Sequence, residues 1–206
     1  MAIYLIRHGK DDEGYRGGWS QRGLNVEGFR QSERLGRYLL VHKDRIPVDE
    51  IISSDLQRAL DTANEIGRAL GKQVIPSGVW RETNNGVIAG MPNEIVDERY
   101  PKLYFAGLRM DERYPGGESP IEFFTRIRHA IEELCAVKEQ EAEEKNTMVV
   151  THGGVINAIY HVLKGKTWTN QAKAYPSSYT SFHKIEHRNG KWMITVENDT
   201  EHLAAK

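Results

Sequence analysis

The sequence predicts an α/β fold, a three-layer αβα sandwich built around a mostly parallel sheet. Short apolar segments alternate with amphipathic helical segments along most of the chain, and this order is typical of a parallel sheet covered by helices on both faces. The segment Ile3–Ile6 is apolar at every position, as expected of a strand buried on both faces. Near the C-terminus, two strand-like segments flank Arg188-Asn189-Gly190, which predicts a hairpin.

Capping residues indicate where the helices begin and end. Asn25 is suited to cap a helix that runs to about residue 40. Ser54 and Gln57 have the spacing of a capping box for a second helix, which Gly71 is placed to end. Another capping box begins at Ser119 and opens a long helix. The strands between these helices are expected at Ile51–Ile52, Val74–Ile75 and Met148–Val150.

The composition excludes several classes of protein. The 206 residues carry a formal net charge of −1, so no overall positive field attracts nucleic acid or an anionic membrane. The N-terminus lacks a signal-peptide pattern, and no segment is long and apolar enough to span a membrane. Cys135 is the single cysteine, which suits a reducing compartment. We therefore expect a cytoplasmic protein without nucleic-acid or membrane partners.

Polar residues follow three of the predicted strands, at the edge where open α/β sheets bind ligands. They are Arg7-His8-Gly9, Arg58 in the first turn of its helix, and His152-Gly153. Two guanidinium groups and the N–H groups of a helix start favour an anion, and guanidinium binds phosphate in a bidentate fashion. The pattern therefore predicts a phosphate site, with the imidazole of His8 as the nucleophile.

Phosphoryl transfer from an ester also needs a proton donor. Glu82 follows a predicted strand by several residues and is our first candidate, with Glu94, Glu118 and Asp111 as alternatives. No HxxH or HExxH pattern occurs, and arginines beside the histidines would repel a metal ion. We therefore expect no metal and no other cofactor.

Residues 83–118 interrupt the alternation of strands and helices. The stretch is rich in glycine, proline and aromatic residues, with one short helical segment near Pro92–Arg99. We interpret it as an insertion that covers the active site, within a single domain spanning residues 1–206. Its aromatic residues fit a small satellite core as well as they fit a substrate pocket.

Several segments carry a family resemblance and keep their order along nearly the whole chain. They are LIRHG, SSDLQRALDTA, the glutamate of WRETNNG, PGGES, VVTHGGVI and the ending ENDTEHL. Together they resemble the signature of the histidine phosphatase superfamily, which has a phosphoglycerate mutase-like fold. The resemblance implies a phosphohistidine mechanism without metal. In that mechanism His8 takes the phosphoryl group and Glu82 protonates the leaving oxygen, while Arg7, Arg58 and His152 hold the phosphoryl oxygens.

The segment after Arg7-His8-Gly9 departs from that signature. Many family members, and the mutases especially, continue with Glu or Gln, then Ser or Thr, and later an Asn that helps to hold phosphate. Here Lys10 and Asp11 occupy the first two positions, and the Asn has no clear counterpart. We expect Arg16 and nearby backbone N–H groups to supply substitute contacts. The further substrate-binding residues predicted are Gly9, Arg16, Gly17, Gly18 and Gly153.

The sequence thus predicts a metal-independent phosphomonoesterase that acts on a small phosphorylated substrate or on a phosphoprotein. A phosphoglycerate mutase is the alternative within the same class, although the chain is shorter than typical cofactor-dependent mutases. A non-catalytic module that binds a phosphorylated ligand is the alternative from a different class. Such a module would be expected to lack His8 or Glu82, and both are present.

Overall fold

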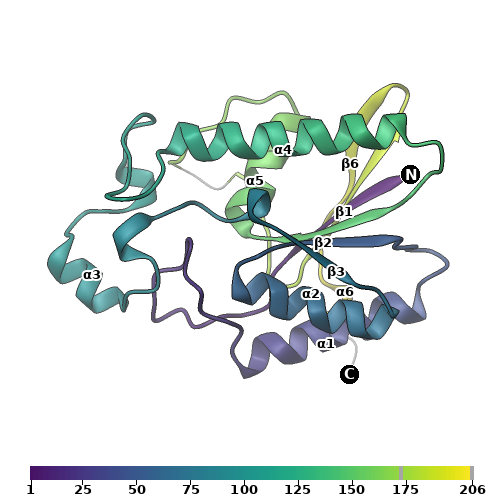
Figure 1. Cartoon of the computed structure of the whole chain (residues 1–206), viewed down its shortest axis with the longest axis horizontal. Coiled ribbons are helices and arrows are strands. Elements are labelled where there is room, and N and C mark those ends of the chain that lie inside the picture. Colours follow the sequence, from purple (N-terminus) through teal and green to yellow (C-terminus); the bar gives the residue numbers. More distant parts are fainter. Residues whose placement is uncertain (172–173, 205–206) are drawn as a thin grey trace.

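In the computed structural model, which describes residues 1–171 and 174–204, a six-stranded sheet forms the centre of the molecule (Figure 1). Its strand order is β3-β2-β4-β1-β5-β6. The strands are β1 (Ala2–Arg7), β2 (Glu50–Ser54), β3 (Val74–Ser77), β4 (Thr147–Thr151), β5 (Phe182–Arg188) and β6 (Lys191–Asp199). The first four pair in parallel, while β5 and β6 form an antiparallel hairpin at one edge. The predicted mostly parallel sheet with a C-terminal hairpin is confirmed.

Helices cover both faces of this sheet. The helices are α1 (Val26–Val41), α2 (Gln57–Leu70), α3 (Asn93–Arg99), α4 (Pro120–Gln140), α5 (Gly153–Leu163) and α6 (Glu201–Ala204), with short 3-10 turns η1 (Gly78–Trp80), η2 (Gly86–Ile88) and η3 (Phe105–Gly107). In Figure 1, α4 and α5 lie on one side of the sheet and α1 and α2 on the other. The three-layer αβα prediction is therefore confirmed.

The continuous apolar run in β1 follows from this double coverage. Ile3 and Leu5 pack into the core under α4 and α5. Tyr4 and Ile6 point the other way, into the core under α1 and α2. Successive side chains of a strand face opposite sides, so a central strand covered on both faces has no position left for a polar residue until it ends.

Two of the three predicted N-terminal caps are confirmed and one is wrong, while Gly71 ends α2 as predicted. The side chain of Asn25 accepts a hydrogen bond from the N–H of Gly28 at 2.9 Å, and Ser119 forms a complete capping box. The capping box predicted at Ser54 does not form, because α2 begins three residues later, at Gln57, without a side-chain cap. Ser54 instead belongs to β2, and its hydroxyl accepts from the N–H of Leu56 at 3.3 Å. A hydrogen bond to His152 engages the same hydroxyl.

Residues 83–118 lie beyond the carboxyl ends of the parallel strands, on the left of Figure 1. They contain η2, α3 and η3 and enclose a small separate core of Ile88, Val96, Leu108 and Tyr114. Main-chain hydrogen bonds at 2.9 Å link Arg16 to Met91 and to Gly90 and so join this segment to the loop after β1. The expected short helix near Pro92–Arg99 is confirmed as α3.

Candidate active site

Three separate segments bring the predicted centre together at the carboxyl edge of the sheet. His8 follows β1, Arg58 lies in the first turn of α2, and His152 follows β4. The rings of His8 and His152 lie 5.1 Å apart, centroid to centroid. The Nε of Arg58 lies 3.3 Å from the Nε2 of His8. Parallel strands end at the same edge of a sheet, and for this reason residues more than a hundred positions apart meet here.

The tautomer of His8 follows from its hydrogen bonds. Its Nδ1 lies 2.8 Å from the carbonyl oxygen of Gly9, and a carbonyl can only accept, so Nδ1 carries the proton. Nε2 therefore has a lone pair, and it accepts from the Nε–H of Arg58. The ring is 95% buried, with an exposed fraction of 5%. A neutral, oriented imidazole whose lone pair lies on Nε2 is suited to act as a nucleophile.

The two arginines are held by carbonyl oxygens. Arg58 donates from Nη2 to Gly18 at 2.8 Å and from Nη1 to Ser20 at 3.2 Å. Arg7 donates from Nη1 to the carbonyl of Ser177 at 2.6 Å. Burial lowers the pKa of Arg58, and the nearby carboxylates act against that shift. Because guanidinium stays charged in proteins, both side chains bring positive charge to His8.

Arg7 keeps an unused donor at the centre. Its guanidinium lies 4.0 Å from the centroid of the Tyr179 ring, which restricts it from one side. Its Nε is buried and has no hydrogen-bond partner among the described residues. No ion pair to Arg7 occurs within the described part of the chain. An arginine with an unpaired charge and an unused buried N–H is suited to an anionic ligand.

His152 is held as a neutral ring. Its Nε2 lies 2.8 Å from the Oγ of Ser54, and the ring is completely buried. Burial is the main cause that lowers the pKa of His152 well below its ordinary value, and the charges of Arg58 and Arg7 lower the pKa further. The hydroxyl of Ser54 accepts from the N–H of Leu56, and Nε2 is the only acceptor for its own hydrogen among the described residues, so that hydrogen goes to Nε2. Nδ1 then carries a proton, and among the described residues it has no partner.

Glu82 faces the start of α5. Its Oε2 accepts from the N–H of Gly154 at 2.9 Å, and its Oε1 accepts from the N–H of Thr83 at 3.2 Å. The positive end of a helix favours a carboxylate at this place. The main chain of Glu82 is fixed as well, because its carbonyl accepts from the indole of Trp19 at 2.8 Å and from Arg126 at 3.2 Å.

The alternative carboxylates lie elsewhere. Glu118 pairs with Arg126 at 2.6 Å and also accepts from the N–H of Asn84. Glu94 and Asp111 are exposed. Of the four carboxylates considered from the sequence, Glu82 is the one that lines the cavity beside the centre.

The glycines predicted to bind substrate have mixed surroundings. The N–H of Gly9 donates to Thr62 at 2.9 Å, and a Cβ at Gly9 would lie 2.6 Å from the carbonyl of Gly28, so Gly9 serves close packing. Gly17 and Gly18 line the cavity. The N–H of Trp19, expected to be available, donates to the side chain of Asn85. Gly153 begins α5 beside Arg7, where a Cβ would lie 3.5 Å from Nε.

Two contacts of the centre have no counterpart in the sequence analysis. The carboxylate of Asp11 lies 3.6 Å from the Nε of Arg58. The hydroxyl of Tyr179 donates to Glu13 at 3.1 Å, which fixes the ring that covers Arg7. Asp11 could have been suspected because it occupies a polar position next to the Arg7-His8-Gly9 motif. Tyr179 could not, because it lies in an irregular loop without a recognisable motif.

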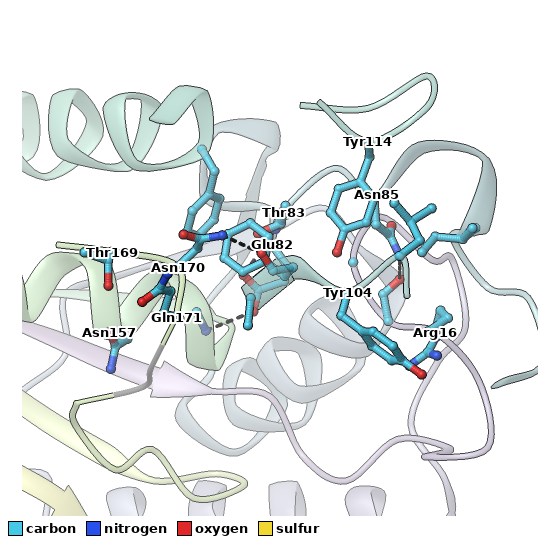
Figure 2. A pocket seen from close by; sticks show the side chains of 18 of the residues that line it. Arg16, Glu82, Thr83, Asn85, Tyr104, Tyr114, Asn157, Thr169, Asn170 and Gln171 are labelled. Atoms are coloured by element: carbon cyan, nitrogen blue, oxygen red, sulfur yellow. Dashed lines mark hydrogen bonds between the residues drawn. The ribbon is translucent and has the colours of Figure 1, made fainter. Parts of the chain in front are cut away.

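A cavity of about 510 Å³ opens beside Glu82. Figure 2 shows Glu82 and Thr83 in the middle, with Arg16, Tyr104, Asn85 and Tyr114 on one side. On the other side lie Asn157, Thr169, Asn170 and Gln171. The volume is in the range of small-molecule sites.

Two searches of the described residues bear on other functions. No group of three or more His, Cys, Asp or Glu side chains within residues 1–171 and 174–204 could hold a metal ion. In the same part of the chain, no helix has the length and the apolar character that crossing a membrane requires.

The fold and the site define a class of protein, an α/β enzyme with an anion site made of histidine and arginine. The model of the histidine phosphatase superfamily (branch 1) matches residues 3–200. A metal-independent phosphoserine phosphatase from Arabidopsis thaliana is 32% identical over 98% of this chain and 83% of its own length. A probable phosphoglycerate mutase from Erwinia tasmaniensis is 25% identical over 98% of this chain and 95% of its own length.

The comparison with solved structures agrees with the family match. A mycobacterial glucosyl-3-phosphoglycerate phosphatase, solved with VO3, superposes with a TM-score of 0.76 at 26% identity, over 96% of this chain and 98% of its own. The chain belongs to the histidine phosphatase superfamily. It is a metal-independent phosphomonoesterase that acts through a phosphohistidine intermediate.

Proposed function

We propose that His8 accepts the phosphoryl group of a small phosphomonoester and that Glu82 protonates the leaving oxygen. The observation that carries the proposal is the bond from Nδ1 of His8 to the carbonyl of Gly9, at 2.8 Å. It places the lone pair of the buried ring on Nε2, beside the Nε of Arg58. An imidazole fixed in this tautomer can attack phosphorus without first losing a proton.

The reaction has two steps. Nε2 of His8 forms a bond to phosphorus while the bond from phosphorus to the ester oxygen breaks, and that oxygen takes the proton of Glu82 and leaves as an alcohol. A water molecule then attacks the phosphohistidine, gives one proton to the carboxylate of Glu82, and the N–P bond breaks. Inorganic phosphate leaves, and both His8 and Glu82 return to their starting states.

Unused donors beside His8 support this assignment. The buried Nε of Arg7 and Nδ1 of His152 have no partner among the described residues. Together with Arg58 they are available to the oxygens of a phosphoryl group. Charge-assisted bonds of this kind contribute about 1.5–3 kcal/mol each. Donors that are fixed before the substrate arrives stabilise the charge of the transition state without reorganisation.

We also propose that residues 83–118 cover the leaving group and that the substrate is a small metabolite rather than a phosphoprotein. The support is the cavity of about 510 Å³, which several residues of this segment line. Arg16, Gly17 and Gly18 would then contact the leaving group rather than the phosphate. A cytoplasmic location is part of the proposal, supported by the buried free thiol of Cys135, which suits a reducing compartment.

The experiment traps the intermediate. The protein is mixed with p-nitrophenyl phosphate in EDTA, quenched in alkali because acid destroys phosphohistidine, digested and analysed by mass spectrometry. We expect an added phosphoryl group on His8 and none in the His8→Ala variant. His129→Ala, which changes an exposed histidine of α4, is the matched control and should label normally. A fully active His8→Ala protein would end the proposal.

Product analysis separates hydrolysis from transfer. With 3-phosphoglycerate as substrate, a mutase forms 2-phosphoglycerate and releases little inorganic phosphate, whereas a hydrolase releases inorganic phosphate from simple monoesters. We expect hydrolysis, because the segment after β1 lacks a counterpart of the Asn that many mutases use. Rapid interconversion of the two phosphoglycerates with little phosphate released would favour the mutase.

A further inference from the structure

The cavity beside Glu82 has an aromatic wall. Tyr104, Phe105 and Tyr114 come from the segment 83–118, while Phe123 belongs to α4 and Trp168 follows α5. Phe105 is central to this wall, with its ring centroid 6.0 Å from that of Phe123 and 6.2 Å from that of Trp168. A leaving group that enters the cavity meets faces and edges of rings, which favour apolar or aromatic groups.

Arg16 is paired with an acidic side chain, while its buried Nε has no hydrogen-bond partner among the described residues. Arg16 is the one cation among the described residues that line the cavity. Its Nη2 lies 2.6 Å from the Oδ1 of Asp97, and the hydroxyl of Tyr104 donates to the same oxygen at 2.9 Å. The guanidinium carbon lies 5.0 Å from the centroid of the Tyr104 ring. Figure 2 shows Arg16 and Tyr104 side by side at one edge of the cavity.

This arrangement is anchored in the main chain. The N–H of Arg16 donates to the carbonyl of Met91, and the carbonyl of Arg16 accepts from the N–H of Gly90, both at 2.9 Å. Asp97 projects from α3, which begins two residues after Met91. The loop after β1 and the segment 83–118 therefore hold the two charges together from both sides.

A negatively charged leaving group would be poorly received here. It would approach the carboxylate of Asp97 and the aromatic wall, and like charges repel. Arg126, the next arginine beyond Glu82, is engaged by Glu118 at 2.6 Å. Moving a carboxylate out of water without an unpaired cation to receive it is unfavourable.

We propose that this cavity selects phosphomonoesters whose leaving group has an apolar or aromatic face and no net negative charge. Asp97 is the residue that determines the preference against a negatively charged leaving group, because it pairs with Arg16. Esters of neutral alcohols and phenols are the substrate class. The proposal rests on the hydrolase function proposed above and adds the chemistry of the leaving group.

The test compares substrates that differ in one group. Glycerol 3-phosphate has a neutral leaving group, and 3-phosphoglycerate carries a carboxylate at the equivalent carbon. Phenyl phosphate supplies an aromatic ring. We expect kcat/KM to decrease in the order phenyl phosphate, glycerol 3-phosphate, 3-phosphoglycerate, with at least about a tenfold difference between the last two, as expected for burying an unpaired charge.

Asp97→Asn tests the residue. The side chain keeps its shape and loses its charge, which leaves Arg16 free to receive a carboxylate. The ratio of kcat/KM for glycerol 3-phosphate to kcat/KM for 3-phosphoglycerate should decrease by about fivefold, mainly because KM for 3-phosphoglycerate falls. An effect of this size is typical of one partly exposed charge. Asp12→Asn is the matched control, because it breaks the exposed pair with Arg22 (3.4 Å). Asp12→Asn should leave the ratio unchanged.

The outcomes separate the two proposals. The selectivity is overturned if the unmodified protein has equal kcat/KM for glycerol 3-phosphate and 3-phosphoglycerate. It is also overturned if Asp97→Asn does not change the ratio of these two values. In either case, hydrolysis of p-nitrophenyl phosphate would still support the proposed function. Failure to hydrolyse p-nitrophenyl phosphate and every other ester overturns the proposed function, and the selectivity with it.

Discussion

Replacing Ser54 with alanine should reduce activity by releasing the ring of His152. The hydroxyl of Ser54 lies 2.8 Å from Nε2 of His152 and is the ring's only hydrogen-bond partner among the described residues. Because Nε2 is the only acceptor for the hydroxyl hydrogen of Ser54 among the described residues, Ser54 donates to Nε2 and keeps the proton of His152 on Nδ1. Nδ1 is the nitrogen that we propose to bind a phosphoryl oxygen.

The size of the effect follows from these contacts. Without Ser54 the two neutral tautomers become similar in energy, and this alone halves the population that can donate from Nδ1, a factor of about 2. The ring also loses the contact that orients it, and an unpaired buried nitrogen costs about 1–3 kcal/mol of folding free energy. We expect kcat/KM for p-nitrophenyl phosphate to fall about 5–30-fold, which corresponds to about 1–2 kcal/mol. The melting temperature should fall by about 2–4 °C per kcal/mol.

Ser53→Ala is the matched control for this experiment. Ser53 is the preceding residue of β2, is also completely buried, and donates to the carbonyl of Ser54 at 2.8 Å. Its side chain points to the opposite face of the strand, so its loss should lower stability without touching His152. Steady-state kinetics and thermal unfolding of both variants decide the matter. If Ser54→Ala and Ser53→Ala lose stability alike and keep equal kcat/KM, Ser54 does not control the tautomer of His152.

Three further predictions address the acid, the fold and the loop after β1. Glu82→Gln should slow hydrolysis of alkyl phosphates by about 10²–10⁴-fold and that of p-nitrophenyl phosphate much less, because nitrophenolate leaves without a proton; equal losses in the two assays would show that Glu82 is not the acid. Burial lowers the pKa of His183 to about 4, so the unfolded chain binds a proton at His183 more readily than the folded protein does. The stability that the neutral His183 contributes is therefore complete above the unfolded pKa and is lost as the pH falls below it. Between pH 7.5 and pH 5, His183 should lower the free energy of unfolding by about 2 kcal/mol, and a urea midpoint that is constant over this range would contradict the prediction. Gly18 has a φ of +59°, which an alanine rarely adopts, and its carbonyl accepts a hydrogen bond from Arg58. Gly18→Ala should therefore weaken inhibition by vanadate. Gly17→Ala, whose added Cβ would meet nothing within 4 Å, should leave this inhibition unchanged.

The end of the site where we propose that phosphate binds could be predicted because its residues lie at, or shortly after, the end of a strand. A buried strand is visible in the sequence as an apolar run, and the polar residues that follow it must lie at the edge of the sheet. This reasoning placed His8 and His152 beside each other, and their rings lie 5.1 Å apart. Arg58 was placed by the same reasoning, even though the capping box assumed for its helix does not form.

The capping box failed for a reason that the sequence does not contain. The spacing of Ser54 and Gln57 satisfies the local pattern, but Ser54 belongs to β2, where it pairs with Ser77 of β3. Its hydroxyl forms a hydrogen bond with His152, nearly a hundred residues away. A tertiary contact thus overrode a local preference. At the other end of the site, the pair of Arg16 and Asp97 depends on how two irregular loops pass each other. No periodic pattern in the sequence indicates how irregular loops are arranged. The end of the site that faces the leaving group could therefore not be predicted.

The way in which Arg58 is held explains how the loop after β1 can depart from the family pattern without disturbing the centre. Arg58 meets this loop at the main-chain carbonyls of Gly18 and Ser20, at 2.8 and 3.2 Å. A main-chain carbonyl is present whatever the side chain, so substitutions such as Lys10 and Asp11 leave these two bonds in place. Apart from Asp11, whose carboxylate lies 3.6 Å from the Nε of Arg58, the side chains of the loop are then free to vary with the substrate. Arg16 lines the cavity and pairs with Asp97 of the segment 83–118. We therefore propose that the chemistry at phosphorus and the choice of leaving group depend on different atoms of the same loop.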